Sequence, residues 1–140
     1  MNKGVVYTSY FSKADKIEDS YKVAIARWLP SFVITEKKIY DTKEPKHYVH
    51  IPEFAPDEDI LTAYKKGGIT FDELLLSMHT RLDIGMKQQS KIKFLVDNFC
   101  KLLDQGNNIA FVCYEKDLES CHRKVIGDLF KKLGYNVIEF

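Results

Sequence analysis

The C-terminal segment of the chain constrains the fold most, because a strand, a polar connection, a helix and a second strand follow there in quick succession. Residues 109–113 (IAFVC) form a short apolar run that is typical of a buried strand. Over residues 121–133 apolar side chains recur at helical spacing, Gly134 predicts the end of that helix, and residues 135–140 predict another strand. This order predicts a βαβ unit with two parallel strands and a right-handed crossover.

The rest of the chain extends this pattern to one α/β domain over residues 1–140. Further strands are predicted at 4–9 and 21–26, a turn or short helix at 11–20, and helices at 57–66, 70–81 and 87–104. Residues 31–56 are irregular apart from two short candidate strands, 32–35 and 48–51, and we interpret most of them as an excursion from the sheet. The fold class predicted is therefore a single α/β domain with a mainly parallel sheet flanked by helices.

Composition excludes several kinds of function. With 21 basic and 20 acidic side chains the net charge is +1, which gives little support to binding of nucleic acid or an anionic membrane. No apolar run is long enough to span a membrane, and the first residues do not resemble a signal peptide, so we expect a cytoplasmic protein without a membrane partner. The three cysteines are an odd count, and we interpret each of them as a thiol rather than as part of a disulfide framework.

The first turn of the last helix is the candidate site. In open α/β sheets ligands bind beyond the carboxyl ends of the strands, where helix N-termini offer free N–H groups and partial positive charge. Cys121, His122 and Arg123 begin the helix at this edge, and a thiol there would have its thiolate stabilised by the dipole and by the neighbouring cation. The sequence thus predicts either a nucleophilic cysteine or an anion-binding turn with Arg123 as a two-pronged donor.

A structural interpretation of the same residues stands beside this one. Cys121 lies four residues before Val125 on the predicted apolar face and could be a small buried side chain. Arg123 could pair with an acid of the connection before the helix, and Cys113, which ends an apolar strand, fits the core better than it fits a reactive site. The helix pattern buries Cys100, to which we assign no chemistry.

Other familiar chemistries lack their motifs. A phosphatase-type loop needs an arginine six residues after its cysteine, but Glu119 stands six residues after Cys113. There is no C-x-x-C, H-E-x-x-H or glycine-rich phosphate loop, so we expect no metal and no cofactor.

The segment VCYEKDLESCHR, residues 112–123, resembles the signature of domain-of-unknown-function family 488: a strand ending in cysteine, a glutamate two residues on, and a Cys-His-Arg triplet opening the last helix. Three further segments are similar to that family: VVYTSYFSK, YKVAIARWLP, and IPEFAPDEDILTAYKKGGITFDELL. The resemblance implies an α/β fold with a mainly parallel sheet. It also implies a cluster in which the C-terminal polar residues meet those of neighbouring strand ends: Glu115, Cys121, His122 and Arg123 with Tyr7, Thr8, Ser9 and Arg27.

Our leading hypothesis is an enzyme in which Cys121 is the nucleophile, His122 exchanges the proton, and Glu115 orients His122 or Arg123. The anion-binding residues would be Arg27, Arg123, Thr8 and Ser9, and the pocket would include Tyr7, Cys113 and Tyr114. The partner expected is a small anionic ligand or substrate. The alternatives are a binding module for a nucleotide or nucleic-acid phosphate without catalysis, and a structural or interaction protein; the oligomeric state stays open.

Overall fold

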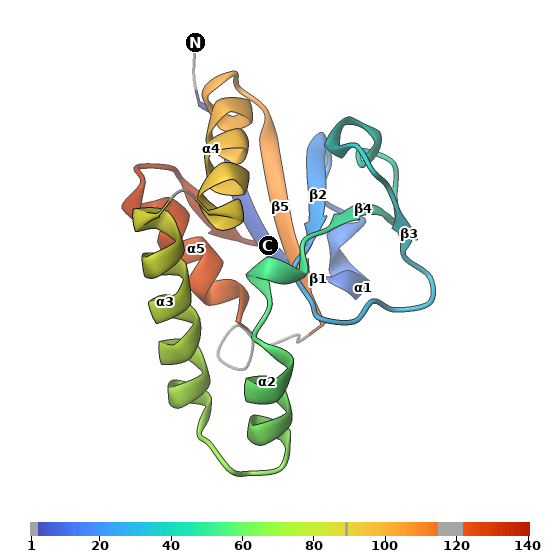
Figure 1. The fold of residues 1–140 in the computed structure, drawn as a ribbon. Helices are drawn as coiled ribbons and strands as arrows, with labels where there is room; N and C mark the ends of the chain where they lie inside the picture. Colours follow the sequence, from blue (N-terminus) through green and yellow to red (C-terminus); the bar gives the residue numbers. More distant parts are fainter. Residues whose placement is uncertain (1–2, 89, 115–121) are drawn as a thin grey trace.

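A computed structural model describes residues 3–88, 90–114 and 122–140 (Figure 1). The strands are β1 Val6–Tyr10, β2 Ser20–Ala24, β3 Ile34–Thr35, β4 His47–His50, β5 Asn108–Cys113 and β6 Val137–Glu139. The α-helices are α1 Phe11–Ala14, α2 Glu58–Lys65, α3 Phe71–Lys87, α4 Lys91–Asp104 and α5 Arg123–Lys132, with short 3₁₀ turns at Ile39–Asp41 and Pro52–Phe54.

The strands form one six-stranded sheet in the order β3-β4-β2-β5-β1-β6, and every pair in it is parallel. The predicted α/β class is therefore confirmed. In the C-terminal βαβ unit β5 and β6 are parallel, and β1 lies between them, with Val6 opposite Ile109 on one side and Val137 on the other. Burial explains the apolar composition of β1 and β5, because a parallel sheet covered by helices hides both of its faces.

Most of residues 31–56 lies outside the strands, as interpreted, but the segment enters the sheet twice. The two short strands predicted there form as β3 and β4, and they build one edge of the sheet, where β4 pairs with β2. These strands are only two and four residues long, which is why the hydrophobic pattern marked them weakly. The loop after β2 therefore crosses to the sheet edge and returns beside β2.

Two apolar clusters cover the two faces of the sheet. On one face the strand residues Val23, Ile109 and Phe111 pack with α3, α4 and α5. On the other face the short helix α1 contributes Phe11 and Ala14, which pack against the small residues of β2 and β5. Figure 1 shows α4 and α5 on one side of the sheet and α1 on the other.

The helices begin and end largely where the sequence predicts. Thr70 accepts a hydrogen bond from the Glu73 backbone N–H and Glu73 reaches back to the Thr70 N–H, so the predicted capping box is confirmed. Helix α3 runs six residues beyond the predicted end at Arg81, because Leu82 and Gly85 are buried against α4 and extend its packed face. Helix α2 differs from the others, since it contains no buried residue.

No helix among the described residues is both long and apolar enough to cross a membrane.

Candidate functional site

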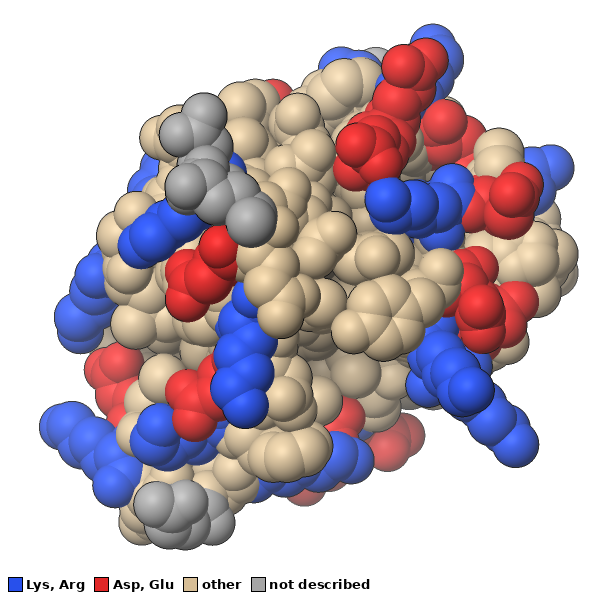
Figure 2. Space-filling model, turned by 90° about the horizontal axis from the view of Figure 1, so that it is seen from above, with Lys and Arg blue, Asp and Glu red and all other residues tan. Residues whose placement is uncertain are grey.

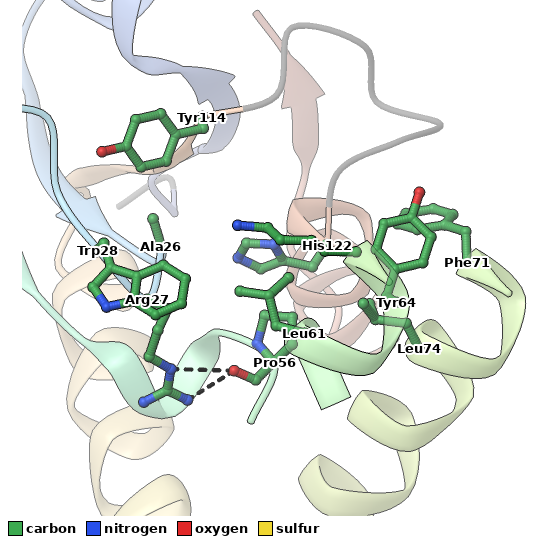
Figure 3. Close-up of a pocket in the computed structure, with 11 residues that line it drawn as sticks. Ala26, Arg27, Trp28, Pro56, Leu61, Tyr64, Phe71, Leu74, Tyr114 and His122 are labelled. Atoms are coloured by element: carbon green, nitrogen blue, oxygen red, sulfur yellow. Dashed lines mark hydrogen bonds between the residues drawn. The ribbon is translucent and has the colours of Figure 1, made fainter. Parts of the chain in front are cut away.

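A pocket of about 510 Å³ lies at the carboxyl edge of the sheet, between the ends of β2 and β5 and the helical pair α2–α3 (Figure 3). Its wall is mainly apolar and aromatic, with three basic side chains. The lining residues are Ala26, Arg27, Trp28, Pro56, Leu61, Tyr64, Lys65, Phe71, Leu74, Tyr114 and His122. This position, beyond the carboxyl ends of parallel strands, is where open α/β sheets bind their ligands.

His122 is held in the pocket wall by the end of β2. Its Nε2 lies 2.6 Å from the carbonyl oxygen of Ile25, and a carbonyl can only accept, so Nε2 carries the hydrogen and Nδ1 keeps its lone pair. Burial, with the charges of Arg123, Arg81 and Arg27, lowers the pKa of His122 to about 4 despite this hydrogen bond. The imidazole is therefore neutral at neutral pH, with a defined tautomer.

Arg27 follows β2 and reaches the segment before α2. Its Nε and Nη2 both donate to the carbonyl oxygen of Pro56, at 3.2 and 2.8 Å (Figure 3). Arg81 of α3 fixes the same segment by donating to the carbonyls of Glu53 and Ala55. Arg81 also pairs with the carboxylate of Asp57, directly before α2, so the two arginines hold this wall of the pocket together.

Aromatic side chains from four parts of the chain surround the cavity. Trp28 and Tyr114 follow β2 and β5 and are 50% and 48% exposed, while Tyr64 and Phe71 come from α2 and α3. Lys65 places its Nζ 5.1 Å from the centre of the Trp28 ring, which connects α2 to the loop after β2. The prediction of the site missed all of these except Tyr114; the pair Gly67-Gly68 between two helical segments was the available signal that α2 and α3 fold back as a unit.

Arg123 lies in a separate environment, away from the pocket lining. It is fully buried, and its Nη2 lies 2.6 Å from Glu139 Oε2 on β6 while Nε contacts both carboxylate oxygens. Its Nη1 donates to Cys113 Sγ at 3.4 Å, and its guanidinium lies 5.9 Å from the Tyr10 ring centre. The acid that pairs with it here is thus Glu139, which the sequence did not single out, since charge in a terminal strand carries no motif.

The residues predicted at the end of β1 do not line the pocket either. Thr8 donates to Glu139 Oε1 at 2.5 Å and so belongs to the buried network of Arg123. Ser9 is fully buried and its hydroxyl has no partner in the described part of the chain. Tyr7 makes an edge-to-face contact with Phe140, with ring centres 6.3 Å apart. Of the predicted site residues, the structure therefore brings Arg27, His122 and Tyr114 together.

The cysteines divide among three situations. Cys113 is buried and disulfide-bonded, so the interpretation of every cysteine as a thiol is wrong for this residue. Cys100 is a free thiol on α4, and burial raises its pKa, as expected for a residue without chemistry. Cys121 and Glu115 lie outside the described residues. Within the described ranges no group of three His, Cys, Asp or Glu residues is placed to hold a metal ion.

Fold and site together define an α/β protein with one parallel sheet and a ligand-sized pocket at its carboxyl edge. The family model described as the active DUF488-N3 subclade, DUF488-N3a, matches residues 6–134, and the chain belongs to the DUF488 family. Comparison with curated proteins and with solved structures gave no match.

Proposed function

We propose that this protein is an enzyme that binds a small anionic ligand in the carboxyl-edge pocket and uses His122 for proton transfer. The observation that carries the proposal is the state of His122: its Nε2 is committed to the Ile25 carbonyl, and its pKa of about 4 keeps Nδ1 unprotonated. A neutral imidazole in a pocket wall, whose Nδ1 makes no hydrogen bond with a described residue, is equipped to accept a proton. The printed description of the family model, which calls this subclade active, agrees with an enzyme.

The ligand's charge would complete the acid–base function. An anion bound beside His122 favours the imidazolium and raises the pKa of this residue toward neutral pH, the range in which a general acid–base works best. Arg27 is the candidate anion-binding residue, because it lines the pocket and Pro56 fixes its guanidinium beside the pocket through two of the nitrogens. Arg123 and Thr8 would support the site indirectly, by anchoring the start of α5 to β6.

The nucleophile in this proposal is Cys121 as a free thiol, in protein whose disulfide at Cys113 has been reduced, with Glu115 as the orienting acid. The Cys121 thiol would pass its proton to Nδ1 of His122 while its sulfur forms a bond to an electrophilic carbon of the substrate. The bond from that carbon to the leaving group would break, and the leaving group would depart with the electron pair and take the proton from Nδ1. This assignment depends on the position of Cys121 directly before His122 in the chain.

Alkylation kinetics test the nucleophile. The protein is treated with iodoacetamide across pH, with reductant because Cys113 is disulfide-bonded, and the modified cysteine is identified by mass spectrometry. Cys121 should react well below the pH at which a model thiol does, and Cys121→Ala should lose this reaction while Cys100→Ala keeps it. A Cys121 that titrates like a model thiol would refute the nucleophile.

A non-catalytic binding module is the second candidate. The observation that favours it is the mainly apolar pocket wall, which can hold a ligand without any reacting thiol. In that case ligand binding would persist in Cys121→Ala, and no substrate would be turned over. A polyanionic partner is less favoured, because the face in Figure 2, seen from above Figure 1, mixes Lys and Arg with Asp and Glu and shows no continuous basic surface.

A further inference from the structure

We propose that the ligand of the carboxyl-edge pocket combines a flat aromatic ring with one anionic group, as a nucleoside monophosphate does. The inference deepens the proposed function, because it names the ligand class of the same pocket. It rests on three observations: the aromatic residues of the wall, the charges of the lining, and the size of the cavity.

The ring has partners ready on two sides of the pocket. Trp28 is half exposed although it lines a cavity, and Tyr114 is similarly exposed on the same side of the view, with Tyr64 and Phe71 on the other side (Figure 3). Large aromatic side chains are normally buried when they only serve the core, whereas exposed ring faces in a concave site are used for stacking on planar ligands. Leu61 and Leu74 add flat apolar surface between the helices and the ring.

Lys65 could contact both the aromatic ring and the anionic group of the ligand. Its ammonium lies over the Trp28 ring at 5.1 Å, which shows that this ring face accommodates a partner. A planar ring that stacks there would displace the ammonium, and the flexible lysine side chain could then turn to the ligand's anionic group. Aromatic contact and anion contact would thus come from neighbouring positions of one wall.

The charges of the lining have one sign. The charged residues that line the pocket are Arg27 and Lys65, beside the neutral His122, and in the described part of the chain no Asp or Glu lines it. Among the described residues Arg27 donates to the Pro56 carbonyl and forms no salt bridge, so within this part of the chain its positive charge is hydrogen-bonded but not neutralised. Glu53, close enough for Arg27 to lower its pKa, is paired with Lys91 at 2.6 Å. Such a lining is complementary to an anion.

The cavity has the size of a small ligand. Its volume of about 510 Å³ falls in the range typical of small-molecule sites, and helices and strand ends line it. We therefore commit to a free small molecule, with a nucleotide and another aromatic phosphate as the two possible sources of the same chemistry.

The only tryptophan of the chain, Trp28, provides the assay. Its fluorescence is titrated with AMP, UMP, phenyl phosphate, adenosine, ribose 5-phosphate and inorganic phosphate. AMP or phenyl phosphate should quench saturably, while adenosine and ribose 5-phosphate, each lacking one half of the pattern, should bind at least about tenfold more weakly. Preference for AMP and UMP over phenyl phosphate identifies a nucleotide; equal binding supports another aromatic anion. Ribose 5-phosphate binding as tightly as AMP, or no saturable binding by any ring compound, would overturn the proposal.

Variants locate the binding, with calorimetry replacing fluorescence where Trp28 is changed. Trp28→Leu and Lys65→Ala should each weaken AMP by about tenfold, whereas Lys66→Ala, the neighbouring lysine outside the pocket lining, should not. Arg27→Lys keeps the positive charge but replaces the forked guanidinium by a single ammonium, so weaker AMP binding by this variant would show that the anion contact needs the fork. If AMP binds but the Cys121 thiol titrates like a model thiol, the proposed nucleophile is refuted and this inference stands. If Cys121 reacts at low pH but no ring compound binds, this inference is refuted and the proposed nucleophile stands.

Discussion

The pKa of His122 makes the stability of the fold depend on pH in a defined window. A histidine in an unfolded chain has a pKa near 6.5, and in the folded chain burial lowers that of His122 to about 4. Between these values the unfolded chain binds more protons, so stability is complete above about pH 6.5 and is lost as the pH falls toward 4. Integrating between about pH 7.5 and pH 5 gives a loss of about 2 kcal/mol from this one residue.

The matched variant is His122→Gln, whose amide can still donate to the Ile25 carbonyl but does not titrate. Urea unfolding of wild type and variant is followed at several pH values, and the difference between their unfolding free energies is plotted against pH. That difference should change by about 2 kcal/mol between pH 7.5 and pH 5, because the wild type loses more stability than the variant. Taking the difference removes the effect of the carboxylates, which titrate in both chains. His79→Gln on α3 serves as the control. A difference that stays constant within about 0.5 kcal/mol would refute a buried neutral imidazole and, with it, the basis of the proposed acid–base function.

Three further predictions concern the frame of the site. Glu139→Ala leaves the buried Arg123 charge without this partner and should lower the free energy of urea unfolding by about 2–3 kcal/mol, less than for a fully buried pair because Glu139 is partly exposed. Adding Arg123→Met to the same chain should recover part of this loss, and no recovery would contradict the pairing argument. Thr70→Ala removes the capping box and should lower the unfolding free energy by about 1 kcal/mol, against a control substitution to serine that keeps the hydroxyl. Gly4→Ala should lower the melting temperature by several degrees, since a Cβ there would lie 1.7 Å from the carbonyl oxygen of Asn107; an unchanged melting curve would show that this close approach is dispensable.

Local patterns predicted the elements of the fold well. The capping signature at Thr70 and the stop at Gly134, which has a φ of 96°, depend on interactions within a few residues, and both formed. The helix predicted over residues 87–104 formed as α4, but it begins at Lys91, because Lys87 belongs to the end of α3. Strands β3 and β4 were predicted as short strands, but the sequence did not predict where they lie in the sheet. That place is decided by pairing with β2 across a long loop, for which the sequence carries no periodic signal.

The candidate site shows the same division between local and distant information. The triplet at 121–123 and the strand end at Cys113 were recognised from adjacent residues, and His122 does face the pocket with Arg27 and Tyr114. The role of Arg123 could not be predicted, because its partner Glu139 lies in β6, the strand that follows α5 in the chain, and the two residues of a buried ion pair have no fixed separation in sequence.

By itself the sequence determined which segments are helices and strands, because hydrophobic period, caps and glycine stops act over a few residues. It also determined that the last crossover brings a histidine to the carboxyl edge of a parallel sheet. Only the tertiary structure decided what surrounds that histidine: the Ile25 carbonyl that fixes its tautomer and the helical pair α2–α3 that closes the wall with Tyr64 and Phe71. The physical reason is that burial and pKa depend on groups brought together from distant parts of the chain, and their proximity exists only after the sheet has formed.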